Sequence, residues 1–379
     1  MKNKEKKIKI LHVARAAGGI GVYIDLIVKH INDERFKNYI IHEDDYQSIS
    51  FASKSGLPVK SYKLPIPREI SPRKDWQAVL KTRKIIEEEN IDLIHAHSAK
   101  GGVIARLAAL GKGVKVLYTP NAFSYLSTPN TIKKFIFLNA ERILKHFNSK
   151  LLASSPSEQE RGIKEVGFKK ENTYLFNNSI APIETTRLTI PKKWPDSYIC
   201  TVGRPSYQKR LDMMIKVLSE LKKEIPNIHL IIMGVGFYAP ELDSINELIN
   251  KLNLSKNITL LPWTAKENVH HIIKNAQMYI STARYEGLPF SIIESLALGK
   301  PVVATNVDGN KDLIINGYNG FLIDGENIIE MKNKIMALLH NKERLEKFSF
   351  NAKRIFEEKY NIHQNIPLLE QIYLENIKK

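Results

Sequence analysis

The stretch RYEGLPFSIIESLALGKPVVAT, residues 284–305, contains two glutamates eight positions apart, Glu286 and Glu294. Pro289 lies between them and suits the first turn of a helix, because its φ angle is held near the helical value. The apolar residues that follow recur at helical spacing, and Gly299 suits the end of a helix. An apolar run typical of a buried strand ends the stretch. We therefore predict a loop that opens a helix, with Glu286 on the loop and Glu294 one to two turns inside the helix.

The same alternation of strand and helix extends over most of the chain. Short apolar runs alternate with longer segments of helical periodicity, and the series restarts after residue 190. This pattern is typical of a parallel, doubly wound sheet, in which ligands bind off the carboxyl ends of the strands. Between the two series, residues 179–196 carry three prolines and a cluster of threonines, which indicates a linker. We therefore predict an α/β protein with two Rossmann-like domains, residues 1–180 and 197–360, facing a central cleft. The expected strands are 8–13, 39–42, 91–96, 115–118, 150–153, 198–202, 229–233, 258–261, 278–282 and 301–305. The main expected helices are 22–30, 76–89, 100–110, 131–147, 210–224, 241–252 and 266–275.

Composition restricts the classes of protein that fit. The chain has 379 residues, of which 43% are hydrophobic and 26% charged, and its one cysteine, Cys200, lies in an apolar run. One cysteine cannot form an internal disulfide, which suits a reducing compartment. No apolar run approaches the length of a membrane span, and the N-terminus lacks the hydrophobic segment of a signal peptide. We therefore expect a cytoplasmic protein.

The net charge of +17 is concentrated in the first half of the chain. Residues 1–180 contain 31 Lys and Arg against 18 Asp and Glu, whereas residues 181–379 contain 26 against 22. A basic surface of this kind suits nucleic acid, an anionic membrane or a phosphorylated ligand, and solvated lysines of a lysine-rich proteome are the alternative. No recognisable nucleic-acid-binding module is present, so we expect no nucleic-acid partner.

A second informative stretch, TVGRPSYQKRLD, occupies residues 201–212. It places Arg204 and Lys209 on a loop between an apolar strand and a helix, and Gly203 permits a tight turn there. A guanidinium offers a fork of donors and an ammonium a compact charge, a combination that binds a diphosphate well. A plain basic surface loop is the alternative. The two glutamates of the opening stretch, in the same domain, favour the diphosphate site.

The combination of these two stretches resembles the retaining glycosyltransferases of family four, which have the GT-B fold. Further segments resemble motifs of that family and occur in its order: Gly18-Gly19-Ile20-Gly21, Ile94-His95-Ala96-His97-Ser98, Tyr118-Thr119-Pro120-Asn121, Asn306-Val307-Asp308-Gly309 and Asn316-Gly317-Tyr318-Asn319-Gly320. The resemblance covers nearly the whole chain. It also implies that the C-terminal helix, residues 361–379, crosses back onto the N-terminal domain.

The resemblance implies a role for each residue of the two stretches. Glu294 would accept hydrogen bonds from the nucleotide ribose, and Glu286 from the hydroxyls of the donor sugar. Arg204 and Lys209 would hold the diphosphate and stabilise it as a leaving group without a metal. The remaining expected contacts are the backbone N–H groups of Gly287 and Leu288 with the donor phosphates, the backbone at Pro262 and Trp263 with the base, and Gly18 and Gly19 near phosphate and acceptor. We therefore expect no metal and no cofactor beyond a UDP-sugar donor.

Asn121 departs from the family's pattern, in which histidine usually follows Thr-Pro close to the 6-hydroxyl of the sugar. Asparagine at this position favours a donor other than a standard hexose. The hypothesis is an N-acetylated amino sugar, including a 6-deoxy sugar such as N-acetylfucosamine, with Asn121 contacting it.

The histidines of the chain do not predict a metal site. His95 and His97 share one face of a strand, but no other His or Cys is placed by the sequence to complete a ligand set. We expect one of them in the core and the other, His97, nearer the strand end. His270 and His271 lie in a helical segment, and we expect them on its surface.

Residues 131–150 combine apolar and aromatic residues with five basic ones at helical spacing. Such a segment is typical of a helix that lies on an anionic membrane, and the alternative is an ordinary helix packed on the sheet. Together with the basic first half, this favours a peripheral enzyme on the inner face of the membrane with a lipid-linked acceptor.

These observations lead to one hypothesis and two alternatives. The hypothesis is a retaining glycosyltransferase that moves a hexosyl or acetamidohexosyl group from a UDP-sugar to an undecaprenyl-diphosphate-linked saccharide in capsule or exopolysaccharide synthesis. The choice of UDP over GDP follows the family. The alternatives are a UDP-sugar 2-epimerase of the same fold and a non-catalytic scaffold of a polysaccharide complex. The complete set of Arg204, Lys209, Glu286 and Glu294 argues against both.

Overall fold

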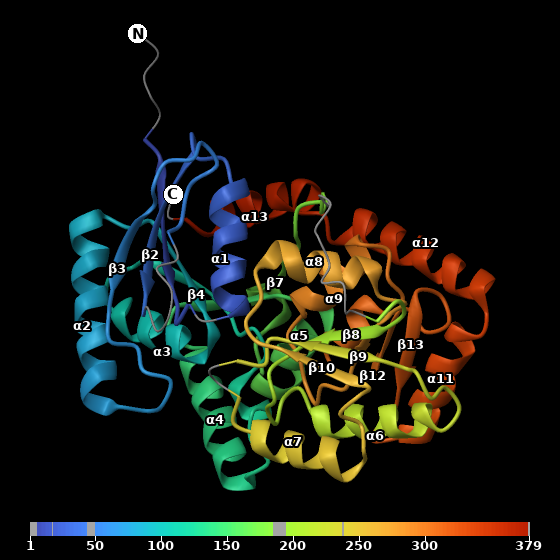
Figure 1. Cartoon of the computed structure of the whole chain (residues 1–379). Helices are drawn as coiled ribbons and strands as arrows, with labels where there is room; N and C mark the ends of the chain where they lie inside the picture. Colours follow the sequence, from blue (N-terminus) through green and yellow to red (C-terminus); the bar gives the residue numbers. More distant parts are fainter. Residues whose placement is uncertain (1–5, 17, 44–49, 185–194, 237–238, 378–379) are drawn as a thin grey trace. The chain divides into compact units, whose positions relative to one another are not determined.

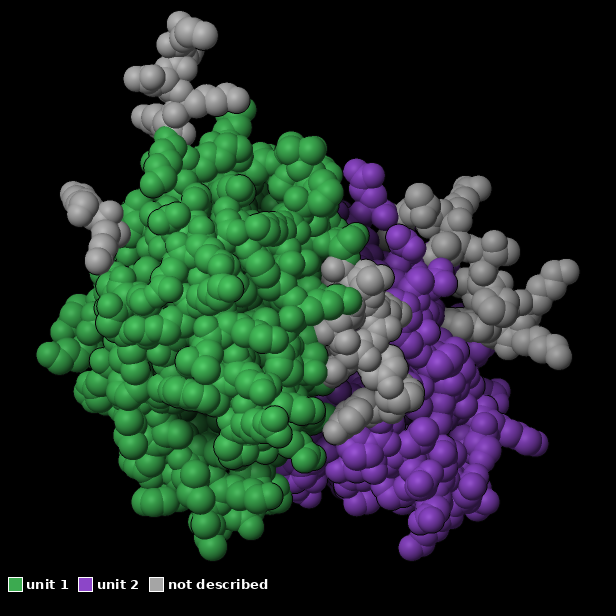
Figure 2. Space-filling model, turned by 90° about the vertical axis from the view of Figure 1, so that its left-hand side faces the viewer, with its two compact units in different colours: residues 1–179, 362–379 green, residues 180–361 purple. Residues whose placement is uncertain are grey.

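The computed structural model describes residues 6–16, 18–43, 50–184, 195–236 and 239–377. The chain folds as two compact units, coloured separately in Figure 2. Unit 1 comprises residues 1–179 and 362–379, and unit 2 comprises residues 180–361. The predicted linker falls at this transition, and its residues 185–194 lie outside the described residues.

Unit 1 contains a seven-stranded sheet in the order β3-β2-β1-β4-β5-β6-β7 (Figure 1). All of its strand pairs are parallel. Its strands are β1 (Ile8–Val13), β2 (Phe36–His42), β3 (Lys60–Lys63), β4 (Leu93–His97), β5 (Lys115–Thr119), β6 (Ser149–Ala153) and β7 (Thr173–Leu175). The strand order reverses between β1 and β4, which is the point where open α/β sheets bind ligands.

The helices of unit 1 include the last helix of the chain. They are α1 (Gly19–His30), α2 (Pro72–Glu89), α3 (Ser98–Ala108), α4 (Thr131–Leu144), α5 (Pro156–Arg161) and α13 (Ile362–Asn376), with short turns at Ser124–Leu126, Gly162–Val166 and Lys170–Asn172. The Glu370 carboxylate of α13 accepts a hydrogen bond from the backbone N–H of Asn32 at 2.8 Å. The Tyr373 hydroxyl of α13 lies 2.7 Å from His95 Nδ1 in β4. These contacts attach α13 to the sheet of unit 1.

Unit 2 repeats the design with six parallel strands in the order β10-β9-β8-β11-β12-β13. Its strands are β8 (Ile199–Val202), β9 (Leu230–Met233), β10 (Ile258–Leu261), β11 (Tyr279–Ser281), β12 (Val302–Thr305) and β13 (Gly320–Ile323). Its helices are α6 (Leu211–Lys222), α7 (Leu242–Lys251), α8 (Lys266–Asn275), α9 (Phe290–Ala297), α10 (Asn310–Leu313), α11 (Ile328–Leu339) and α12 (Lys342–Lys359). Each unit has its own apolar core, and the predicted pair of parallel, doubly wound domains is confirmed.

Three strands escaped the sequence analysis, namely β3, β7 and β13. Each lies at an edge of its sheet. Edge strands can bury less of their surface than central strands and then need no continuous apolar run, which explains β3 and β7 but not β13, a short apolar strand that is mostly buried. β3, for example, is Lys-Ser-Tyr-Lys and is mostly exposed.

The opening stretch folds largely as predicted. Helix α9 begins at Phe290, and Glu294 lies in its second turn. Pro289, however, precedes the helix as its N-cap with φ −71° and ψ 120°, so its predicted place in the first turn is wrong by one residue. An extended N-cap is the usual conformation, because the chain must turn into the helix at that residue. Gly299 follows the C-cap Leu298 with φ +67°, which confirms the predicted stop.

Candidate active site

Glu286 lies in the loop after β11, next to the loop that follows the neighbouring strand β8. Lys209 Nζ donates to Glu286 Oε1 at 2.7 Å, and Gln208 Nε2 donates to Oε2 at 3.0 Å. Burial by itself lowers the pKa of Lys209, but the adjacent Glu286 carboxylate, together with Tyr279, raises the pKa above its ordinary value. Lys209 therefore stays charged. Both oxygens of Glu286, a residue 7% exposed, have a donor before any ligand binds.

The loops after β8 and β11 are joined by hydrogen bonds behind this ion pair. Thr282 Oγ1 donates to the backbone carbonyl of Arg210 at 2.8 Å, and the backbone N–H of Arg284 donates to the carbonyl of Gln208 at 2.8 Å. The Tyr279 hydroxyl lies 2.9 Å from Ser291 Oγ, and burial raises the pKa of this phenol. The two loops therefore form one supported platform, which positions Lys209 and Glu286 in advance of a ligand.

Gly309, from the Asn306-Val307-Asp308-Gly309 segment, packs directly against this platform. A Cβ atom built on Gly309 would lie 2.7 Å from the carbonyl oxygen of Gly287 and 2.9 Å from Glu286 Cβ. Its φ of +79° also suits glycine. A larger residue at this position would displace the Glu286 loop.

Glu294 lies on α9, with its side chain directed at α8. The carboxylate Oε1 is 3.3 Å from His270 Nε2 and 3.7 Å from Lys266 Nζ. Within the described part of the chain, no group donates a hydrogen bond to this carboxylate. The surface position predicted for His270 is wrong, since its side chain is only 13% exposed. Sequence periodicity along α8 could not reveal a partner on another helix.

The other site residues predicted in unit 2 also follow the carboxyl ends of its strands. Arg204 lies exposed on the loop after β8, close enough to Lys209 that its charge opposes the raised pKa of the lysine. Gly287 and Leu288 are buried beside Glu286. Pro262 and Trp263 follow β10, and Trp263 is 68% exposed. The roles assigned to these residues stay predictions, but the structure brings their loops to one edge of the sheet.

Left-handed backbone marks the corresponding edge of unit 1. Gly18 caps α1 with φ +59°, and Gly19 begins the helix. After β5, Asn121 and Ala122 have φ angles of 52° and 72°. Such conformations in residues other than glycine cost energy and are often found at functional sites. Asn121 Nδ2 is buried and has no hydrogen-bond partner among the residues the structure covers.

Glu158, which the sequence analysis did not identify, holds this strained turn. Its Oε1 accepts from the backbone N–H of Ala122 at 2.7 Å, and its Oε2 accepts from the backbone N–H of Ser154 at 2.7 Å. Ser155 caps α5 and accepts from the backbone N–H of Glu158. The Ser-x-x-Glu spacing typical of a helix start was the signal in the sequence that pointed to this residue.

Three imidazoles meet in the core of unit 1, which corrects two predictions. His12 in β1 lies in register with His95 in β4, and His12 Nδ1 is 3.1 Å from His97 Nε2. The sequence analysis predicted no third imidazole near His95 and His97, because it could not place β1 beside β4. His97 is the last residue of β4, as predicted, but it is fully buried like His95, so the expectation of only one core histidine is wrong. Burial lowers the pKa of His12 to about 4, and those of His95 and His97 well below the ordinary value.

Hydrogen bonds assign the protons of these neutral rings. Thr119 Oγ1 donates to a backbone carbonyl, so it accepts from His95 Nε2–H at 2.9 Å, and the Tyr373 hydroxyl donates to His95 Nδ1. His12 Nε2–H donates to Asn38 Oδ1 at 3.1 Å, so His12 Nδ1 accepts from His97 Nε2–H. In the described residues only His97 Nδ1 lacks a partner among the nitrogens of these three rings. The three nitrogens lie close enough to hold a metal ion, but a metal would have to displace this network, so we interpret the cluster as structural.

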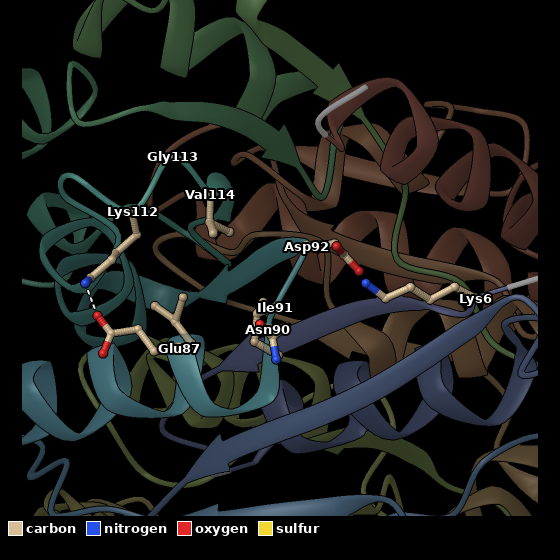
Figure 3. Close-up of a pocket in the computed structure, with 9 residues that line it drawn as sticks. Lys6, Glu87, Asn90, Ile91, Asp92, Lys112, Gly113 and Val114 are labelled. Atoms are coloured by element: carbon tan, nitrogen blue, oxygen red, sulfur yellow. Dashed lines mark hydrogen bonds and ion pairs between the residues drawn. The ribbon is translucent and has the colours of Figure 1, made fainter.

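A cavity of about 290 Å³ lies at the opposite, amino-terminal edge of the unit 1 sheet (Figure 3). It is lined by residues such as Lys6, Asn90 and Asp92. Three of its charged groups already have partners, since Glu87 and Lys112 form an ion pair and Asp92 accepts from the backbone N–H of Lys9. We assign this cavity no ligand. None of the candidate site residues lines it.

Comparison with known proteins identifies both halves of the chain. Residues 17–182 match the model of Glycosyltransferase Family 4, and residues 183–355 match that of Glycosyl transferases group 1. Over its full length the chain is 24% identical to UDP-Gal:alpha-D-GlcNAc-diphosphoundecaprenol alpha-1,3-galactosyltransferase from Escherichia coli, covering 99% of that protein. It is 25% identical to the putative glycosyltransferase EpsD of Bacillus subtilis over 79% of this chain and 81% of EpsD.

Solved structures show the same fold. Sucrose-phosphate synthase from Thermosynechococcus elongatus superposes with a TM-score of 0.84 at 16% identity, covering 98% of this chain and 99% of that one. HepE from Anabaena, in complex with UDP and glucose, superposes with a TM-score of 0.81 at 19% identity, covering 98% and 100%. The predicted GT-B fold class is thereby confirmed. The cleft expected between the two domains stays a prediction.

Proposed function

Because the chain belongs to the glycosyltransferases, with a family 4 domain followed by a group 1 domain, we propose that it transfers a sugar from a UDP-sugar with retention of configuration. The observation that carries this proposal is the platform of unit 2. There Arg204, Lys209 and Glu286 come together after the neighbouring strands β8 and β11, and Glu294 lies in the second turn of α9. The set combines cations for a diphosphate with carboxylates for hydroxyl groups.

The diphosphate leaves with its charge stabilised by the two cations. Lys209 already neutralises Glu286 at 2.7 Å, so a bound diphosphate would share an ammonium group that is fixed in place. The bond between the anomeric carbon and the phosphate oxygen breaks, and the acceptor oxygen forms its bond on the same face. The departing diphosphate oxygen takes the proton of the acceptor hydroxyl. Two cations in this position supply the charge stabilisation that a metal supplies elsewhere, and we propose that no metal is required.

The similarity to proteins that bind UDP supports UDP as the nucleotide. HepE was solved with UDP and glucose, and the name of the Escherichia coli relative specifies UDP-Gal as donor. In our proposal the backbone at Pro262 and Trp263 reads the base, and the backbone N–H groups of Gly287 and Leu288 bind phosphate. Asn121, whose Nδ2 has no partner in the part of the chain described, contacts an N-acetylated amino sugar, including a 6-deoxy one such as N-acetylfucosamine.

The acceptor in our proposal is an undecaprenyl-diphosphate-linked saccharide, with Gly18 and Gly19 beside it. The name of the Escherichia coli relative gives a lipid-linked acceptor of this chemistry. A lipid-linked acceptor requires an enzyme that works at a membrane surface. In the described ranges no helix is long and apolar enough to span a bilayer. We propose that the protein surface makes the contact with the membrane.

Helix α4 provides such a surface on unit 1. Its apolar residues Ile132 and Phe135 are 72% and 67% exposed, whereas Glu141 is the one buried residue of the helix. Glu141 Oε2 accepts from Arg106 Nη2 at 3.0 Å. A polar anchor therefore holds α4, while Phe137 packs against the core and a further apolar face is left open. This arrangement supports membrane contact over the alternative of an ordinary packed helix.

Helix α2 carries a second exposed stripe on the same unit. Trp76 and Leu80 are one turn apart and exposed, and Ile70 precedes them. Arg73 and Lys84 continue the stripe at helical spacing and are also solvent-accessible. Tryptophan flanked by basic residues suits the headgroup region of an anionic bilayer. We propose that α2 and α4 both contact the inner face of the membrane.

The membrane contact is testable by co-sedimentation with vesicles. We expect wild-type protein to bind vesicles containing phosphatidylglycerol at low salt. The replacement Phe135→Ser should weaken binding about tenfold, because burying one phenylalanine contributes roughly 1.5–3 kcal/mol. Replacement of Phe350, an exposed phenylalanine of unit 2, is the matched control. Equal binding by all three proteins would contradict docking through α4.

Transfer itself is testable by nucleotide release. Purified protein is incubated with membranes and a panel of UDP- and GDP-sugars. We expect release of UDP that depends on acceptor and is lost in Glu286→Ala. Conversion of a UDP-sugar to its 2-epimer without acceptor would instead support the epimerase. Nucleotide binding without any turnover would support the scaffold.

A further inference from the structure

The contact between His270 and Glu294 is the part of the site that the proposed roles leave unexplained. His270 lies on α8 and Glu294 on α9, and the side chains of both are mostly buried. The imidazole Nε2 is 3.3 Å from Glu294 Oε1. Within the described ranges this nitrogen is buried and makes no hydrogen bond. A buried imidazole nitrogen without a partner is costly, so its position beside a carboxylate requires an explanation.

Lys266 does not supply that explanation. It lies one turn before His270 on α8, and its Nζ is 3.7 Å from the same oxygen, Oε1. However, the Lys266 side chain is 49% exposed, and exposed ion pairs of this kind contribute little. His270 is the neighbour that is shielded from solvent. The position of the Glu294 carboxylate therefore depends mainly on the imidazole.

Both contacts from α8 reach one oxygen of the carboxylate. Glu294 Oε2 has no ion pair or hydrogen bond with any described residue. The carboxylate is thus held from one side and open at the other, which is the arrangement that accepts hydroxyl groups from a ligand. By contrast, both oxygens of Glu286 are occupied by Lys209 and Gln208.

We propose that His270 is a positioning residue for nucleotide binding, which donates from Nε2–H to Glu294 Oε1 and so orients the carboxylate toward the ribose hydroxyls. The inference rests on the proposed function, in which Glu294 binds the ribose. Without the imidazole the carboxylate rotates freely and its directional contacts with the hydroxyls weaken. His270 does not touch the ligand, so its effect should be specific to the ribose hydroxyls.

The test is a comparison of two ligands by calorimetry, UDP and its 2′,3′-dideoxy analogue. We expect wild-type protein to bind UDP more tightly than the analogue, and Glu294→Ala to lose this preference. His270→Phe should reduce the preference by about tenfold or more, the order of one hydrogen bond to a charged group. His270→Gln should restore most of it, because the glutamine amide nitrogen reaches the position of Nε2.

His271→Phe is the matched control, since it makes the same change at the next position of α8, where no ion pair with Glu294 exists. A His270→Phe protein that binds both ligands more weakly by the same factor would overturn the inference, because a purely structural role predicts that result. An unchanged preference would overturn it as well. Wild-type protein that binds UDP and the analogue equally would instead refute the ribose role of Glu294, and with it the premise.

Discussion

The imidazoles of unit 1 and the carboxylates of unit 2 are both buried polar groups, but their partners differ. In unit 1, His12, His95 and His97 satisfy one another and their neighbours, except for one nitrogen. In unit 2, Glu294 has an oxygen that no described residue contacts, and Glu286 depends on a lysine that a diphosphate would share. Polar groups that are fully hydrogen-bonded to one another stabilise a fold, whereas a polar group with an unused acceptor can bind a ligand. Residue type and strand position alone do not distinguish the two cases.

The largest expected effect is on catalysis in unit 2. Glu286→Ala should reduce kcat/KM for the donor about 10²–10³-fold, because it removes a contact to the sugar and the partner that fixes Lys209. The measurement is initial rate of UDP release against donor concentration. Glu286→Gln is the control, because it keeps the shape and retains a hydrogen-bond acceptor. If the alanine variant kept more than a tenth of wild-type activity, the role of the platform would be refuted.

The next largest effect is on stability in unit 1. His95→Phe leaves Thr119 and the Tyr373 hydroxyl without their ring partner, so the free energy of unfolding should fall by about 2–4 kcal/mol. Urea unfolding measures it. Glu294→Gln, in unit 2, should change the same quantity by no more than about 0.5 kcal/mol. If both variants lost the same free energy of unfolding, the distinction between a structural network in unit 1 and a binding site in unit 2 would be refuted.

The stability of the buried histidine network in unit 1 should also decrease at acid pH. The histidine pKa values are lowered by burial in the folded state, so the unfolded chain takes up protons first as the pH falls below 6.5. The free energy of unfolding therefore holds the full contribution of these neutral rings above pH 6.5. Between pH 6.5 and about pH 4, the His12 contribution decreases by about 1.4 kcal/mol for each unit that the pH falls. Urea unfolding at several pH values measures the slope. The His12→Gln variant lacks the proton that His12 takes up on unfolding, so its stability should depend less steeply on pH. The same pH dependence as in the wild type would contradict the assignment of His12 as buried and neutral.

The smallest expected effect concerns the choice of sugar. Asn121→His should shift the donor preference toward a standard hexose by roughly 3–10-fold, the range available from one pocket contact. Asn121 has φ 52°, a conformation that histidine also adopts, so the loop should keep its shape. Competition between a UDP-hexose and a UDP-acetamidohexose measures the ratio. An unchanged ratio would remove Asn121 from the sugar site.

Local patterns were sufficient to predict most central elements of the fold. Strand β10 and helix α8 have the predicted bounds, because apolar runs and helical periodicity reflect burial on known faces. The edge strands β3 and β7 were missed, since their largely exposed or half-exposed sequences lack that signal, whereas the missed edge strand β13 is mostly buried and only four residues long. The place of Lys209 near Glu286 followed from two motifs on loops after parallel strands. The two motifs did not predict the direct ion pair between Lys209 and Glu286 or the hydrogen bond from Gln208.

The sequence by itself determined the family, the alternation of strands and helices, and the residue types of the site, because these depend on local periodicity and motif spacing. The tertiary structure alone decided which polar groups meet. His12 is more than 80 positions from His95, and Glu158 is 36 positions from Ala122, yet parallel pairing and loop packing place each pair together. Such contacts depend on strand order and register, which no short stretch encodes. The contact between His270 and Glu294 is a further example, because helical periodicity predicts each helix but not which side chains of α8 and α9 meet.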